Sequence, residues 1–249
     1  MRSKNGTART FVWTGMQGID PPGGGDMESR VVWIGGSSRS GKSTIGERIA
    51  AEYRYHYISG DAVASAHARD AAAGTVASRF RKAMEDDDAL NEILLGSVAN
   101  LADLYLAWAR EEFDLARSEL NAPAVHGTEG TVVDAFSLLP ELVLEHLQNG
   151  NVVFLYSTED FQRKLWEKAE WVRSIAARTA DPTLAVANFI EAAVRRDKML
   201  ERQAKAYGLP HVHTGGYQTE AASYARVVEH LFRSSYFFTR KNRSLRRLS

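Results

Sequence analysis

The residues best suited to chemistry form a short run near the start of the chain, residues 36–43, with the sequence GSSRSGKS. Glycines at both ends let the backbone turn tightly, so that successive N–H groups can point inward at an anion. The run matches the pattern GxxxxGK[ST], in which the lysine reaches the β and γ phosphates of a nucleoside triphosphate and the last hydroxyl binds Mg²⁺. The spacing therefore predicts a phosphate-binding loop, with Lys42 as the phosphate contact and Ser43 as a metal ligand.

The flanking sequence places this loop between a strand and a helix. Residues 30–35 are mostly apolar, as expected of a parallel strand covered on both faces, and residues 44–53 have a helical pattern. The N-terminus of that helix would add its partial positive charge to the anion site. The expected nucleotide contacts in this region are Gly36, Ser37, Ser38, Arg39, Ser40, Gly41, Lys42, Ser43 and Thr44.

The composition is that of an ordinary globular protein, with 44% hydrophobic residues among 249. The 31 basic and 31 acidic residues cancel, so no net charge would draw the chain onto nucleic acid or an anionic membrane. The sequence has no cysteine, which excludes disulfides and thiolate metal sites, and no apolar stretch approaches the roughly 20 residues that span a bilayer. We therefore expect a cytoplasmic protein with neither a membrane nor a nucleic-acid partner.

The two ends are predicted to lie outside the folded domain, which we place at residues 29–239. Residues 1–28 are rich in Gly, Ser and Thr, so we expect a disordered leader. It could be an extension upstream of a translation start at Met27. Residues 240–249 are rich in Arg and Lys. Either a solvated tail or a basic arm that binds a partner would have this composition.

Strand-like and helix-like segments alternate along the domain, which predicts an α/β fold with a parallel sheet. Residues 61–121 are too long for a simple crossover and lack strand patterns, so a helical insertion is expected there. A second insertion is expected at residues 158–179, either as a surface helical hairpin or as a closing lid. The five predicted strands are residues 30–35, 54–59, 123–126, 151–156 and 210–214.

This order of parts resembles the nucleoside monophosphate kinase-like group of P-loop phosphotransferases, which includes adenylate, shikimate and gluconate kinases. The paired glycines and paired serines of residues 35–43 look most like the loop of the chloramphenicol phosphotransferase branch. Residues 59–62, SGDA, are similar to the segment where that branch and shikimate kinase place an aspartate. The resemblance implies a three-layer α/β/α fold with sheet order 2-3-1-4-5, an acceptor-binding insertion at 61–121, a lid at 158–179, and ATP with Mg²⁺ as cofactors.

Residue types and the resemblance together suggest roles for several side chains outside the loop. Asp61 could take the proton of an acceptor hydroxyl, hold a magnesium-bound water, or cap the following helix. Glu129 could orient a metal-bound water or be an exposed loop acid. In the second insertion, Arg178 and Arg173 are either solvated or stabilise the transferred phosphate. Gly215 follows the fifth strand, where the resemblance implies a loop around adenine.

One departure from the group concerns the metal site. The third predicted strand ends in His126, so no apolar run followed by an aspartate is expected beside the loop. Mg²⁺ would then lack the acidic partner that P-loop enzymes usually supply.

These observations predict an ATP-dependent enzyme that transfers the γ-phosphoryl group to a hydroxyl of a small molecule. A nucleotide or nucleoside kinase is an alternative, which would need arginines in the insertion to grip an acceptor phosphate. A non-catalytic regulatory protein that binds ATP is another. The sequence leaves the acceptor, the choice of ATP or GTP and the oligomeric state open.

Overall fold

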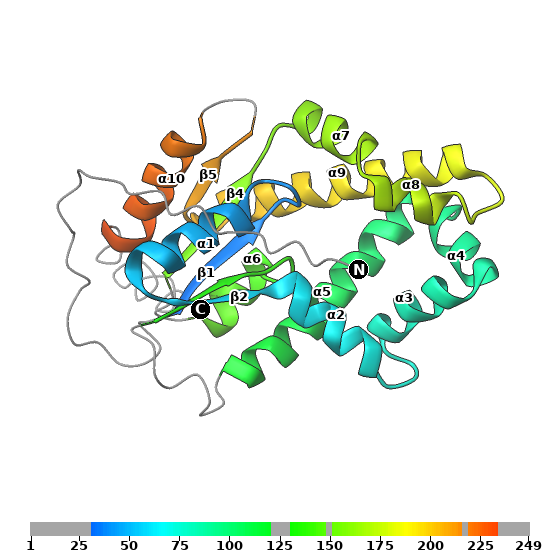
Figure 1. Cartoon of the computed structure of the whole chain (residues 1–249), viewed down its shortest axis with the longest axis horizontal. Coiled ribbons are helices and arrows are strands. Elements are labelled where there is room, and N and C mark those ends of the chain that lie inside the picture. Colours follow the sequence, from blue (N-terminus) through cyan, green and yellow to red (C-terminus); the bar gives the residue numbers. More distant parts are fainter. Residues whose placement is uncertain (1–30, 121–129, 148–150, 216–218, 234–249) are drawn as a thin grey trace, which may run out of the picture.

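The computed structural model describes residues 31–120, 130–147, 151–215 and 219–233, which form a parallel sheet with helices on both faces (Figure 1). The sheet has five strands in the order β2-β3-β1-β4-β5, which confirms the predicted α/β class and the order 2-3-1-4-5. The strands are β1 (Val31–Gly36), β2 (His56–Ser59), β3 (Thr131–Asp134), β4 (Asn151–Tyr156) and β5 (His211–His213).

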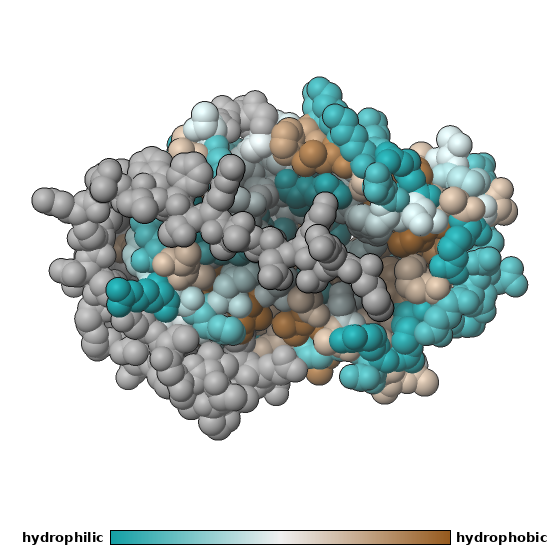
Figure 2. Space-filling model, in the orientation of Figure 1, coloured by the Kyte–Doolittle hydropathy of each residue, from teal (hydrophilic) through white to brown (hydrophobic). Residues whose placement is uncertain are grey.

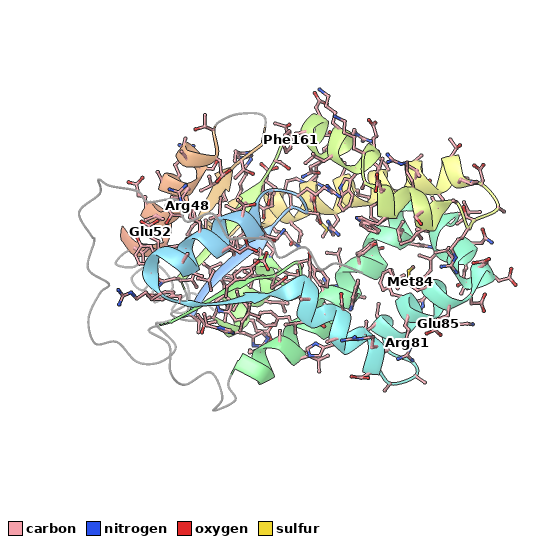
Figure 3. All side chains as sticks on the ribbon, viewed as in Figure 1. Arg48, Glu52, Arg81, Met84, Glu85 and Phe161 are labelled. Atoms are coloured by element: carbon pink, nitrogen blue, oxygen red, sulfur yellow. The ribbon has the colours of Figure 1, made fainter. Side chains whose placement is uncertain are left out.

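One face of the sheet is covered by two helical segments, α1 (Lys42–Tyr53) and α10 (Glu220–Val228) with its continuation η3 (Glu229–Arg233). Val32 and Ile34 of β1 point into this core. In Figure 3, Arg48 and Glu52 lie on α1, and both contact Tyr224 of α10, through the face of its ring and through its hydroxyl respectively. These polar contacts fix α10 against α1 at the edge of the apolar core.

The opposite face is covered by α5 (Val98–Leu120), α6 (Pro140–His146) and α9 (Pro182–Ala206). Trp33, which lies between Val32 and Ile34 in β1, packs here against Phe113 of α5. Because side chains alternate along a strand, β1 is buried on both faces, as its continuous apolar run predicted.

The insertion after β2 consists of helices α2 (Gly60–Asp70), α3 (Val76–Glu85), α4 (Asp87–Leu94) and the start of α5. The segment after β4 forms α7 (Glu159–Glu167) and α8 (Glu170–Ala176), which we call the lid helices. Both groups pack onto the parts of α5 and α9 that extend beyond the sheet (Figure 1). Leu90, Leu101, Trp166 and Phe189 belong to this second apolar core, so α5 and α9 connect it to the sheet.

The third strand corrects the sequence prediction. Residues 123–126, including His126, lie outside the described residues, and β3 occupies the position between β1 and β2. The expectation that no apolar run precedes an aspartate was wrong, because Val132 and Val133 lead directly into Asp134. The two segments are only four residues apart, and the prediction chose the earlier one.

The predicted leader and basic tail, residues 1–28 and 240–249, lie outside the described residues. Among the helices that the structure does describe, none combines the length and apolar character needed to cross a membrane.

Candidate active site

The loop between β1 and α1 has the backbone conformation that an anion cradle requires. Gly36 and Gly41 have positive φ angles of 107° and 88°, a region that favours glycine. A Cβ at Gly36 would lie 2.1 Å from the carbonyl oxygen of Leu155, so the loop can start only with glycine. The N–H of Ser37 donates to that same carbonyl at 2.8 Å. The start of the loop is therefore fixed to β4.

The residue that follows β5, Thr214, is hydrogen-bonded to the middle of the loop. Thr214 donates through its hydroxyl to the carbonyl of Ser40 at 2.7 Å, and the Ser40 hydroxyl donates to the carbonyl of Ser37 at 2.8 Å. Arg39, with a φ of 59°, places its guanidinium 4.7 Å from the ring centre of Trp166 on α7. The loop thus contacts the sheet on one side and a lid helix on the other.

Lys42 extends back over the loop that it follows. Its ammonium donates to the carbonyl of Ser37 at 2.7 Å and lies 3.5 Å from that of Gly36. Burial lowers the pKa of Lys42, and the negative charges of Asp61, Asp197 and Asp134 oppose this shift, Asp61 most strongly. The ammonium donates to neutral carbonyl oxygens, so negatively charged phosphate oxygens would be favourable partners for it.

Asp134, at the end of β3, connects the loop to the insertion. The Ser43 hydroxyl donates to one of its carboxylate oxygens at 2.5 Å, and the N–H of Gly60 donates to the other at 3.1 Å. A Cβ at Gly60 would lie 2.4 Å from the Asp134 carbonyl oxygen, so this close approach requires glycine. Asp134 is only 4% exposed. It was missed from the sequence, although the run TVVD could have identified it.

Asp61 lies in the first turn of α2, directly after Gly60. The N-cap of this helix is Ser59, whose hydroxyl accepts from the N–H of Ala62 at 3.4 Å, so the capping role considered for Asp61 belongs to Ser59. Asp61 is exposed and lines a cavity together with Ser38 of the loop. Its negative charge is also close enough to Lys42 to oppose the lowering of the Lys42 pKa.

Arg196, in the middle of α9, lines the same cavity as Asp61 and contacts the loop. Its guanidinium donates to the Ser38 hydroxyl at 2.8 Å and to the carboxylate of Asp197 at 2.8 and 2.9 Å. The side chain is 11% exposed and lies over the ring of Tyr105, 5.5 Å from its centre. Sequence reasoning missed Arg196, because within a long helical pattern nothing distinguishes it from the adjacent Arg195.

The two lid arginines selected from the sequence lie elsewhere. Arg178 donates to the carboxylate of Asp87 at 2.7 and 2.9 Å and to the carbonyl of Met84 at 2.9 Å. Arg173 donates to the carbonyl of Glu167 at 2.6 Å. Neither side chain lines the cavity beside the loop. In this arrangement they connect surface helices, whereas Arg196 contacts the loop through Ser38.

The remaining predicted site residues have mixed placements. Glu129 lies outside the described residues, and Thr44 is exposed in the first turn of α1. Gly215, two residues after β5, adjoins Phe161 of α7, which Figure 3 shows near that strand. A Cβ at Gly215 would lie 2.6 Å from the Phe161 ring, so β5 and the lid meet closely here.

A cavity of about 550 Å³ opens beside the loop. Ser38, Asp61 and Arg196 line it, and helices of the insertion, the lid helices and α9 form its walls. Its other polar lining residues are Ser65, Arg69 and Arg81. On the face shown in Figure 2, hydrophobic side chains (brown) are visible between the hydrophilic outer surfaces of these helices on the right. The aromatic side chains that line the cavity are Phe80, Tyr105, Trp108, Phe136, Trp166, Trp171 and Phe189.

Comparisons with known proteins give similarity in structure only. No protein-family model and no curated protein matches the sequence. A shikimate kinase structure from Bacteroides thetaiotaomicron is 17% identical, with a TM-score of 0.43 over 80% of this chain and 96% of its own. A gluconokinase structure from Sinorhizobium meliloti 1021 is 17% identical, with a TM-score of 0.41 over 84% of this chain and 95% of its own. Both are kinases by name, but at these scores neither supports a conclusion about what this chain binds.

Proposed function

We propose that this protein is an ATP- and Mg²⁺-dependent kinase that phosphorylates a hydroxyl group of a small molecule. The observation that carries this proposal is the shared cavity of Ser38, Asp61 and Arg196, which places an acid and a cation beside the phosphate loop. Phosphoryl transfer needs mainly positioning and charge stabilisation, and these are the residue types that supply them.

The residues present fit a magnesium–nucleotide complex. Gly36 and Gly41 give the loop its anion-binding shape, and Lys42 would exchange the carbonyls it now contacts for phosphate oxygens. Ser43 and Asp134 form the hydroxyl and carboxylate pair that P-loop enzymes use at magnesium. When bound, Mg²⁺ would neutralise charge on the phosphates.

Asp61 and Arg196 would act on the reaction itself. Asp61 accepts the proton of the acceptor hydroxyl as its oxygen forms a bond to the γ phosphorus. The bond from that phosphorus to the bridging oxygen breaks, and ADP leaves with the bonding electrons. Arg196, now on Ser38 and Asp197, stabilises negative charge on the transferred group. Arg173 and Arg178 would have to leave their present partners to take part.

A direct test combines nucleotide binding with transfer of labelled phosphate from ATP to a pool of hydroxylated compounds. Lys42→Met should abolish tight ATP binding, because it removes the ammonium but keeps a side chain of similar length. Lys164→Met, at an exposed position of α7, is the matched control and should bind ATP normally. Failure of the unmodified protein to bind ATP would reject the proposal.

The catalytic role of Asp61 is separable from nucleotide binding. Asp61→Asn should bind ATP but transfer phosphate about 100-fold more slowly, a typical loss for a general base. Slow ATP hydrolysis that no acceptor stimulates, unchanged by Asp61→Asn, would instead favour a regulatory ATP-binding protein.

A further inference from the structure

The cavity beside the loop is lined mainly by apolar side chains, and seven of the lining residues are aromatic. Ring contacts run continuously around it, starting on α3, where Phe80 lies 4.8 Å from Trp108 and 5.0 Å from Tyr105. Tyr105 of α5 in turn lies 6.2 Å from Phe189 of α9. Elements from the insertion and from the long helix α9 therefore share one aromatic surface.

The lid helices complete this surface on the other side. Trp166 of α7 and Trp171 of α8 lie 5.0 and 5.4 Å from Phe189, both with edge-to-face geometry. Trp171 is 47% exposed, although it is among the largest apolar side chains of the chain. A tryptophan that stays exposed at the wall of a cavity offers a ring face to a ligand.

Two of the cations that line the cavity are already hydrogen-bonded to other protein atoms. Among the described residues that line it, the basic ones are Arg69, Arg81 and Arg196. Arg81, labelled in Figure 3, donates to the carbonyls of Arg69 and Ala71 at 2.8 and 3.0 Å, at the C-terminal end of α2. Arg196 is engaged at the loop end. A nucleoside monophosphate acceptor would need at least two arginines on its phosphate, so Arg81 or Arg196 would have to leave its present partners to bind one.

A highly polar acceptor fits this wall poorly. A sugar acid would place several hydroxyls and a carboxylate against rings that offer them few hydrogen bonds, at an unfavourable desolvation free energy. An aromatic molecule would gain from stacking and from burial of apolar surface. A cavity of about 550 Å³ is large enough for a compound with more than one ring.

We propose that the acceptor is an aromatic alcohol, with its rings against Trp166, Trp171 and Phe189 and its hydroxyl beside Asp61. This inference rests on the proposed kinase function and specifies its substrate class. In the transfer, the alcohol oxygen bonds to the γ phosphorus of ATP, its proton passes to Asp61, and ADP leaves. The products are the aryl-alkyl phosphate and ADP.

The test uses naphthylethanol as the aromatic probe, with D-gluconate as a polar hydroxy acid and AMP as a phosphate-bearing acceptor. Calorimetry on the full chain measures binding of each, with and without a non-hydrolysable ATP analogue. Transfer of labelled phosphate from ATP is measured in parallel. Naphthylethanol should bind at least about tenfold more tightly than gluconate or AMP, which is a modest difference for stacked rings.

Variants at Trp171 show whether binding occurs at this surface. Trp171→Ala should weaken naphthylethanol binding about tenfold, and Trp171→Phe should restore most of it, since it retains a ring. The control is Tyr207→Ala, which removes another exposed aromatic side chain, 41% exposed and outside the cavity lining. All three should bind ATP as the unmodified protein does.

The outcomes separate this inference from the kinase proposal. If ATP binds but gluconate or AMP is preferred, or naphthylethanol binding is absent or unaffected by Trp171→Ala, the aromatic acceptor is wrong and the kinase proposal stands. If naphthylethanol binds at Trp171 but ATP does not bind, the kinase proposal fails and the aromatic specificity of the cavity is supported.

Discussion

The hydroxyl oxygen of Ser43 lies 2.5 Å from a carboxylate oxygen of Asp134, although 91 residues separate them in the chain. The contact joins the first turn of α1 to the end of β3, directly beside the phosphate loop. In the proposed kinase this carboxylate would be the acidic partner of Mg²⁺, and it also accepts a hydrogen bond from the N–H of Gly60 at the start of α2.

Asp134→Asn is predicted to lower kcat about 100-fold or more, because the amide keeps the size of the side chain but removes the charge that supports Mg²⁺. Metal-free nucleotide binding should change little. The measurement is the Mg²⁺ dependence of turnover in this variant and in a control, Asp103→Asn, which changes an exposed acid on α5. Equal Mg²⁺ dependence in the two variants would show that Asp134 does not serve the metal.

Arg196→Gln is predicted to lower kcat about 100-fold while the KM for ATP changes less, since the guanidinium is proposed to act on charge that develops during transfer. Arg195→Gln removes the neighbouring exposed arginine of the same helix and should leave both constants unchanged. Arg178→Gln, which breaks the pair with Asp87, should also leave kcat near normal. A large loss in Arg178→Gln alone would return the catalytic role to the lid.

Gly36→Ala is predicted to destabilise the fold by about 3 kcal/mol or more, because the new methyl group would overlap the Leu155 carbonyl. Gly74→Ala is the matched control, as Gly74 also has a positive φ, of 93°, but open space around it. The free energy of unfolding of Gly74→Ala should fall by only about 1 kcal/mol, because alanine disfavours a positive φ. Urea unfolding of both variants measures the difference.

His67→Ala is predicted to destabilise the protein by about 2 kcal/mol, because it removes a hydrogen-bond partner of the buried Glu112 carboxylate. Glu112 is 2% exposed, and its oxygens lie 2.8 and 3.0 Å from the Nδ1 atom of His67. The contact joins α2, which carries Asp61, to α5. His56→Ala, at an exposed position of β2, should change the free energy of unfolding by less than about 0.5 kcal/mol.

Lys42 should make stability depend on alkaline pH. In the folded protein, burial lowers the pKa of Lys42 below its ordinary value of 10.5. At pH values between the lowered pKa and 10.5, the unfolded chain therefore binds more protons than the folded protein. The free energy of unfolding contributed by Lys42 therefore rises with pH over that interval. We expect the free energy of unfolding of the unmodified protein, minus that of Lys42→Met, to increase with pH over this interval. A constant difference would mean that the pKa is not lowered.

The sequence by itself determined the phosphate loop and most of the sheet. The run GSSRSGKS is recognisable because its glycines and its lysine must lie at fixed spacings along the chain to shape one turn. The continuous apolar runs of β1 and β4 likewise required burial on both faces, whatever packs on them. Asp61 was selected because the segment SGDA follows a predicted strand and resembles the place where related kinases have an aspartate.

Only the tertiary structure decided which charges face the loop. Arg196 meets Ser38 across 158 residues, and Asp134 meets Ser43 across 91, so no local spacing encodes either pair. The aromatic cavity has the same origin, because its rings come from helices that are far apart in sequence and separately look like ordinary core-facing helices. Local patterns fix backbone shape over a few residues, whereas a site assembled from several elements depends on how their faces pack.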